Sequence, residues 1–143
     1  MAACPPPDKT NMRLRTLLLF GLSLPGFALA AQSGADVYAT TCIECHGSGK
    51  FQAPLFGDAR QWKKLIREGL NDLVPSALAG IRKMPAKGGN PDLSDEEIAR
   101  AVIYMANAAG GRFAEPTGAD IARWRQKADK RSEEHTSELQ SQR

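Results

Sequence analysis

The chain has 143 residues, a formal net charge of +3, a hydrophobic fraction of 42% and a charged fraction of 24%. That length has room for one domain at most. Residues 31–130, the expected mature protein, carry a net charge of only +2, so the composition gives no support for nucleic-acid binding. Their pattern is helical throughout, because no stretch alternates apolar and polar residues as a half-buried strand would.

Residues 1–30 have the layout of an export signal. Arg13 and Arg15 precede an apolar stretch, and "ALA" at residues 28–30 supplies a small-residue cleavage site. The apolar stretch is too short to be a comfortable membrane span. We therefore expect a secretory signal peptide preceded by a misread start before Met12, and hence a bacterial periplasmic protein. An uncleaved N-terminal anchor is the alternative.

The first half of the central region is expected to hold three helices. The first covers about residues 34–45. The second covers residues 59–68, with Asp58 at its N-cap and Gly69 in the usual C-terminal position. A short third helix is expected over residues 73–78, with a proline tolerated in its first turn.

Residues 80–93 are irregular, because they contain two prolines and three glycines. The helix after them has the clearest cap in the chain: Ser94 at N-cap and Glu97 at N3 fit the capping box, ahead of an apolar face. A glycine pair should end this helix, so the core domain is expected to cover residues 31–111. Residues 112–130 form a C-terminal extension that we expect to be partly helical.

Residues 131–143 look foreign to this fold. The string "RSEEHTSELQS" resembles the translation of a common DNA-sequencing adapter and is polar apart from Leu139. We interpret the segment as read-through that is not native. The interpretation removes His135 as a candidate ligand and leaves His46 as the only histidine of the expected mature chain.

The segment "CIECH", residues 42–46, contains the residues with the most specific chemistry. On a helix, Cys42, Cys45 and His46 stand at i, i+3 and i+4, so their side chains project from one face. Two thiols at that spacing suit the two vinyl groups along one porphyrin edge, and the adjacent imidazole reaches the iron. C-x-x-C-H is the attachment motif of c-type haem. We predict one haem c per chain, covalently attached through Cys42 and Cys45.

Three other interpretations of the cysteine pair stay open. A thioredoxin-like redox pair would need a βαβ setting, which the helical pattern lacks. A zinc site would need a fourth ligand, and residues 31–130 contain no other Cys or His. A plain disulfide would stabilise the fold weakly, because it would close a very short loop.

The second axial ligand of a haem held by His46 has two candidates, Met84 and Met105. Met105 follows the apolar stripe of the last core helix, so ordinary core packing is expected there. Met84 lies in the irregular segment, and Pro85 restricts it to an extended backbone. A thioether is a good iron ligand in a His/Met haem, where it raises the reduction potential. We predict Met84 as the ligand, with packing on the core as the alternative.

The loop after the motif, "GSGKFQAPLFG" at residues 47–57, offers an acceptor for the second ring nitrogen of His46. A ligating histidine normally donates its other N–H to such an acceptor. The carbonyl of Pro54 is the candidate, brought near by the glycine-rich turn; a simple turn without this role is the alternative. The predicted cofactor-binding residues are Cys42, Cys45, His46, Met84 and Pro54, with His46 and Met84 on the metal.

Together these residues make the chain resemble a class I cytochrome c. The resemblance rests on Gly34 and Tyr38 before the motif, Pro54-Leu55 after it, Met84-Pro85, and the helix that carries Tyr104. The string "MPAKGGNPDLSDEEIARAVIYMA" looks closest to the small bacterial cytochromes of the c-five type. The resemblance implies an all-α fold of three to five helices around one haem. Its first and last helices would cross beside the haem, with Gly34 allowing their close approach and both tyrosines near the crossing.

The loop after the methionine departs from that resemblance. Many proteins of the c-five type carry an extra cysteine pair there, whereas residues 90–93 of this chain contain none. We therefore expect packing and glycine turns alone to hold this loop.

A haem with both axial positions filled leaves no open position for a substrate. We predict a soluble periplasmic one-electron carrier, not an enzyme. Residues 50–87 have a charge balance of +5 and residues 88–109 a balance of −3. If the basic part rims the exposed haem edge, it would steer a redox protein with an acidic docking surface. Contact with a membrane is expected only through a partner complex or an uncleaved signal.

Three other functions stay open. One is a haem-based sensor in which Met84 dissociates and the iron binds a gas. Another is an accessory haem subunit docked on a respiratory oxidase or reductase, with Arg123, Trp124 and Arg125 of the extension as the contact. The third is a haemless disulfide module.

Overall fold

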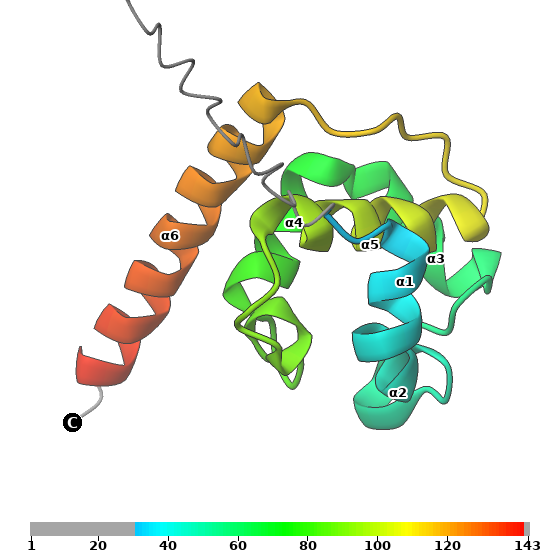
Figure 1. The fold of residues 1–143 in the computed structure, drawn as a ribbon. Helices are drawn as coiled ribbons and strands as arrows, with labels where there is room; N and C mark the ends of the chain where they lie inside the picture. The colour runs from blue at the N-terminus through cyan, green and yellow to red at the C-terminus, as the bar shows by residue number, and fades with distance from the viewer. Residues whose placement is uncertain (1–30, 142–143) are drawn as a thin grey trace, which may run out of the picture.

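The computed structural model describes residues 31–141, so the predicted signal segment at residues 1–30 lies outside the described residues. In chain order the elements are α1 (Gly34–Val37), η1 (Tyr38–Cys42), α2 (Ile43–His46), η2 (Lys50–Gln52), α3 (Ala59–Glu68), α4 (Leu70–Ala79), η3 (Ala86–Gly89), α5 (Asp95–Ala108) and α6 (Gly118–Ser141) (Figure 1). The described residues form no strand, which confirms the predicted all-α class. Within residues 31–141, no helix combines the length and the apolar character that a membrane span requires.

The first helical arm comprises α1, η1 and α2 and runs without a break from residue 34 to residue 46. The side chain of Ser33 caps it by accepting from the backbone N–H of Asp36. The predicted extent is therefore nearly correct. The pattern did not indicate that η1 is a π-helical turn, in which the N–H of Ile43 donates to the carbonyl of Tyr38. Single π-helical turns of this kind recur next to functional sites.

Helices α1 and α5 cross in close contact. A Cβ atom on Gly34 would lie 2.3 Å from the carbonyl oxygen of Arg100, so only glycine fits there. Three aromatic rings fill the space beside the crossing. Tyr38 lies 4.4 Å from Phe56 and 5.8 Å from Tyr104, measured between ring centroids. The predicted crossing, and the place of both tyrosines beside it, are confirmed.

Helix α3 has the predicted bounds and fixes the loop before it. The side chain of Asp58 accepts from the first backbone N–H groups of the helix, and Gly69 ends it with φ +78°. Trp62 is buried, and its Nε1 donates to the carbonyl of Leu55 at 2.8 Å. The helix therefore holds the loop that follows the cysteine motif.

Helix α4 is longer than predicted. It begins at Leu70, so Pro75 lies in its second turn, where the missing N–H removes one backbone hydrogen bond. Burial explains the difference, since Val74 and Pro75 are fully buried and Leu78 is nearly so. The free energy of burying this face offsets the lost hydrogen bond. Helix α5 forms with the predicted capping box between Ser94 and Glu97.

Helix α6 packs along α4 and forms an outer layer at the left of Figure 1. It runs through residue 130 without a break, so the interpretation of residues 131–143 as read-through stays a prediction. Trp124 is buried, and its Nε1 donates to Asn71 at 2.8 Å. Arg125 is also turned inward, toward Asp95. The predicted use of Trp124 and Arg125 as a partner contact is therefore wrong, because the domain itself occupies both side chains.

Candidate functional site

The cysteine–histidine motif lies at the end of the first helical arm. Cys42 and His46 are buried, Cys45 is half-buried, and the intervening Ile43 and Glu44 are exposed. The three predicted site residues of the motif therefore lie toward the inside of the molecule. Both thiols are free, so the disulfide interpretation has no support here.

The environment of Cys42 does not suit a reactive dithiol. Burial, and secondarily the neighbouring Cys45, raise the pKa of the Cys42 thiol to about 11. A redox pair requires the opposite shift, because the thiolate is the reacting form. Within residues 31–141, no group of three or more His, Cys, Asp or Glu side chains gathers around a possible metal position. The redox and zinc interpretations therefore lack support among the described residues.

The ring of His46 is oriented by the following loop. Its Nδ1 lies 2.9 Å from the carbonyl oxygen of Pro54, the contact expected from the sequence. Because a carbonyl only accepts, Nδ1 carries the proton and the lone pair resides on Nε2. The backbone of Phe56 donates to the carbonyl of His46 at 2.7 Å, which ties the same loop to the end of α2.

The Nε2 atom of His46 is free to bind a metal. Among the described residues, no hydrogen bond involves it, and every fully buried side-chain nitrogen or oxygen has a partner. The unpartnered Nε2 is therefore not sealed inside the protein. A histidine with an anchored Nδ1–H and a free Nε2 has the usual arrangement of an iron ligand.

Sequence reasoning missed how α3 supports this histidine. Gln61 accepts from the backbone N–H of Leu55 at 3.1 Å, and Trp62 donates to the carbonyl of the same residue. The Trp62 ring also lies 6.2 Å from the ring of His46. The sequence places Trp62 within the second predicted helix, but it held no information about which loop the tryptophan contacts.

Met84 lies on a tight turn between α4 and η3. Ile81 and Met84 exchange two backbone hydrogen bonds, of 3.0 and 2.9 Å. Gly80 has φ +85°, and a Cβ atom on it would lie 2.8 Å from the backbone nitrogen of Ala86. The turn is thus closed on both sides, and the side chain of Met84 is half-buried against the core. Met105 is 3% exposed within α5, as expected for a core residue.

Two contacts bring the Met84 segment next to the motif and its loop. Lys83 Nζ lies 5.9 Å from the centroid of the Phe51 ring. A Cβ atom on Gly88 would lie 3.2 Å from the side chain of Thr41, directly before the motif. In Figure 1 the α2 end of the first arm and the irregular segment before α5 extend to the same side of α5.

Large apolar side chains are exposed on these segments. Ile43 in the motif is 47% exposed, Phe51 in the following loop 57%, and Ile81 beside Met84 49%. Together with two free thiols and an available imidazole nitrogen, these side chains suit a flat, apolar, iron-containing ring. The residues present therefore fit a c-type haem.

Comparisons with known proteins agree with this fit. Residues 29–105 match the family described as "Cytochrome C oxidase, cbb3-type, subunit III". Cytochrome c-555 of Prosthecochloris aestuarii is 40% identical over 83 residues, which cover 52% of this chain and 84% of that protein. Cytochrome c5 of Azotobacter vinelandii is 42% identical over 77 residues, covering 52% of this chain and 93% of that protein.

A solved structure shares the fold. It is a chain from the crystal structure of an electron-transfer complex of nitrite reductase with cytochrome c, with 34% identity and a TM-score of 0.52. The alignment covers 53% of this chain and 93% of that one.

The helical fold and the C-x-x-C-H segment define a class I cytochrome c, a small haem protein that transfers electrons. The chain belongs to the cytochrome c family that its residues 29–105 match. Within the class it fits the c5 type and carries one covalently attached c-type haem.

Proposed function

We propose that this protein is an exported one-electron carrier, with its haem attached through Cys42 and Cys45 and held axially by His46 and Met84. The main supporting observation is the geometry of His46: Nδ1 is anchored 2.9 Å from the Pro54 carbonyl, and Nε2 has no hydrogen-bond partner within residues 31–141. The turn that carries Met84 gives further support, because its side chain is half-buried and its neighbours Lys83 and Gly88 lie close to Phe51 and Thr41.

Each residue has a distinct task in this proposal. The haem supplies reversible one-electron chemistry at its iron. Pro54 orients His46, while Met84 contributes a soft sulfur ligand, which favours a higher reduction potential. With both axial positions held by the chain, no position is left for a substrate, so we propose no catalytic activity.

Visible spectroscopy tests the axial ligands. The full chain would be exported by a bacterium with a haem-maturation system and compared with Met84→Ala and Met105→Leu. We expect a low-spin haem whose weak far-red Met–iron band disappears in Met84→Ala and persists in Met105→Leu, because Met105 is a core residue. Loss of the band in Met105→Leu alone would assign the ligand to Met105. A parent protein without the band that binds carbon monoxide would favour the sensor function.

The docking surface is centred on Phe51. Lys50 and Lys83 lie 5.3 and 5.9 Å from its ring centroid, so an exposed aromatic ring is flanked by two cations. Lys50 also pairs with Glu44, whereas Arg82 and Lys83 are exposed and have no ion pair recorded within residues 31–141. Because Lys50 is paired, fewer uncompensated positive charges lie around Phe51 than the charge balance of residues 50–87 suggests. We propose that it receives a redox protein with an acidic rim around an apolar centre.

The cellular location follows from residues 1–30, whose pattern is that of a cleaved secretory signal. Mass spectrometry of the protein released by osmotic shock tests this proposal. A mature chain that begins at Ala31 supports periplasmic export. A chain that retains residues 12–30 and sediments with membranes supports an uncleaved anchor.

An accessory subunit of a respiratory oxidase or reductase is the second candidate, favoured by the oxidase-subunit description of the matched family. Its contact would have to avoid Trp124 and Arg125, which face α4 and α5. Membrane fractions washed with high salt separate the two functions. A correctly cleaved protein that stays with an oxidase complex favours the subunit, whereas release into the soluble fraction favours the carrier.

A further inference from the structure

Helix α6 lies outside the residues that match the cytochrome family, yet it packs on α4 and contacts the start of α5, the two helices that flank the segment with Met84. The family match ends at residue 105, and α6 begins at Gly118. Arg125, in the first half of α6, points back to Asp95 at the start of α5. The contact between Arg125 and Asp95 thus joins α6 to the start of α5, which directly follows the segment that carries Met84.

Arg125 and Asp95 form a two-pronged ion pair. Arg125 Nε donates to Oδ2 of Asp95 at 2.6 Å, and Nη2 donates to Oδ1. The two side chains are 35% and 22% exposed. An ion pair in which a guanidinium donates two hydrogen bonds to one carboxylate is stronger and more directional than a single surface contact. Asp95 is also in the first turn of α5, where a negative charge is favourable.

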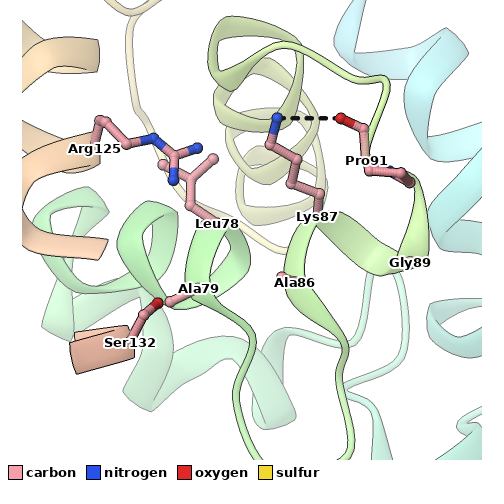
Figure 2. Close-up of a pocket in the computed structure, with 8 residues that line it drawn as sticks. All are labelled: Leu78, Ala79, Ala86, Lys87, Gly89, Pro91, Arg125 and Ser132. Atoms are coloured by element: carbon pink, nitrogen blue, oxygen red, sulfur yellow. Dashed lines mark hydrogen bonds between the residues drawn. The ribbon is translucent and has the colours of Figure 1, made fainter. Parts of the chain in front are cut away.

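Lys87 extends this pair into the Met84 segment. Its Nζ lies 3.6 Å from Asp95 Oδ1 and donates to the carbonyl of Leu93 at 2.5 Å. It also lies 3.5 Å from the carbonyl of Pro91, the contact drawn in Figure 2. Lys87 and Arg125, both drawn in Figure 2, are among the residues that line one hollow between η3, α4 and α6. The hollow has a volume of about 430 Å³. Asp95 therefore joins a cation from α6 to a cation three residues after Met84.

The backbone around Lys87 needs such support. Lys87 has φ +52°, and the two glycines that follow have φ +65° and +88°. A left-handed conformation is unfavourable for a non-glycine residue. The contacts of Nζ offset this cost and join η3 to the start of α5. The expectation that packing and glycine turns alone hold the loop is therefore wrong.

We propose that Arg125 and Asp95 are positioning residues for the axial methionine, acting through Lys87, so that α6 braces the segment that presents Met84. The proposal rests on Met84 being the iron ligand. The loop that Lys87 contacts contains no cysteine, so no disulfide holds it within residues 80–93. The brace gives α6 a role in keeping the sulfur on the iron.

A purely structural role for α6 makes a different prediction. Lys127 lies two residues from Arg125 and pairs with Asp72 of α4 at 2.8 Å, away from Lys87 and Asp95. Lys127→Gln is thus a matched control: it removes one charge from the same helix and weakens its docking without touching the brace. Arg125→Gln is the test variant, and Arg125→Lys partly restores the charge.

Competition by imidazole measures how readily the methionine leaves the iron. Imidazole binds only when the Met84 segment opens, so its apparent affinity rises with the open fraction. We expect Arg125→Gln in the full-length haem protein to bind imidazole about three- to tenfold more tightly than the parent. Arg125→Lys should give an intermediate value and Lys127→Gln a value within about twofold of the parent.

Amide hydrogen exchange over residues 81–90 gives a second readout that does not depend on the iron. Faster exchange there in Arg125→Gln than in Lys127→Gln supports the brace, whereas equal exchange and equal imidazole affinity in the two variants overturn it. Failure of the proposed ligand is separately visible: Met84→Ala would leave the spectrum and the imidazole affinity of the parent unchanged. In that case, faster exchange in Arg125→Gln would show that Arg125 stabilises residues 81–90 only. It would refute the proposed effect of Arg125 on the bond between the methionine and the iron.

Discussion

Gly34 of α1 and Arg100 of α5 approach so closely that a Cβ atom on residue 34 would lie 2.3 Å from the Arg100 carbonyl oxygen. The contact is with backbone, so no side-chain rotation can relieve a clash. It sets how the first arm lies on α5, and the arm carries Cys42, Cys45 and His46 at its far end. A displacement at this crossing would therefore move the site.

Gly34→Ala should lower the free energy of unfolding by about 2–3 kcal/mol, because the helices must separate to admit one methyl group. Gly118→Ala is the control, since a Cβ atom there meets nothing within 4 Å. Urea unfolding of both haem-loaded variants measures the difference. Equal stability of the two variants would show that the crossing tolerates a wider separation.

Trp124→Ala should destabilise the protein by about 3 kcal/mol, because it leaves a cavity between α6 and α4 and removes the hydrogen bond to Asn71. Arg123→Ala changes the preceding, exposed residue and should cost no more than about 0.5 kcal/mol. Both values come from urea unfolding monitored by circular dichroism. A negligible loss in Trp124→Ala would mean that α6 does not pack on the domain in solution.

Asp95→Asn should reduce stability at neutral pH and flatten its decline in acid. The hydrogen bond from Arg125, and then the charges of Arg125 and Lys87, lower the pKa of Asp95 below its ordinary value, against the opposing effect of partial burial. The folded state thus favours the carboxylate, and the resulting stability is present above about pH 4 and lost as the pH falls through the lowered pKa. We expect a loss of about 1–2 kcal/mol at pH 7.

Unfolding free energies measured between pH 7 and about pH 3 test this prediction. The two pH profiles should converge at the acid end, where the parent carboxyl is protonated as well. Parallel profiles would show that Asp95 does not contribute to the loss of stability in acid. Other carboxyls with lowered pKa, such as Asp72 and Glu97, should still give Asp95→Asn some acid sensitivity.

Lys83→Gln should have opposite effects on the rates of electron exchange with a small anionic reagent and with a small cationic reagent. If Lys83 lies at the edge used for transfer, oxidation by the hexacyanoferrate(III) anion should slow about twofold and reduction by the hexaammineruthenium(II) cation should quicken. Lys130→Gln removes the same charge from an exposed position on α6 and should leave both rates unchanged. Stopped-flow measurement at low salt is required, because exposed charges are screened beyond about 10 Å at 0.1 M salt. Equal effects of the two variants would contradict the proposed docking surface.

Much of the site could be predicted from the sequence because its signals are local. The spacing of Cys42, Cys45 and His46 acts within two helical turns, and the caps at Asp58 and Ser94 act within three residues. Such short-range patterns do not depend on how the helices later pack. The helical class, most helix bounds and the haem motif followed from them.

Other features depended on contacts between segments far apart in the chain. Burial extends α4 through Pro75, and the packing of α3 fixes the loop that orients His46. The proposed role of α6 depends on the contact between Arg125 and Asp95, which are thirty positions apart in the chain. The sequence alone therefore determined which residues can hold a haem, because those signals are local. Only the tertiary structure decided which contacts hold these residues in place, since burial and ion pairing depend on where the packed helices bring each side chain.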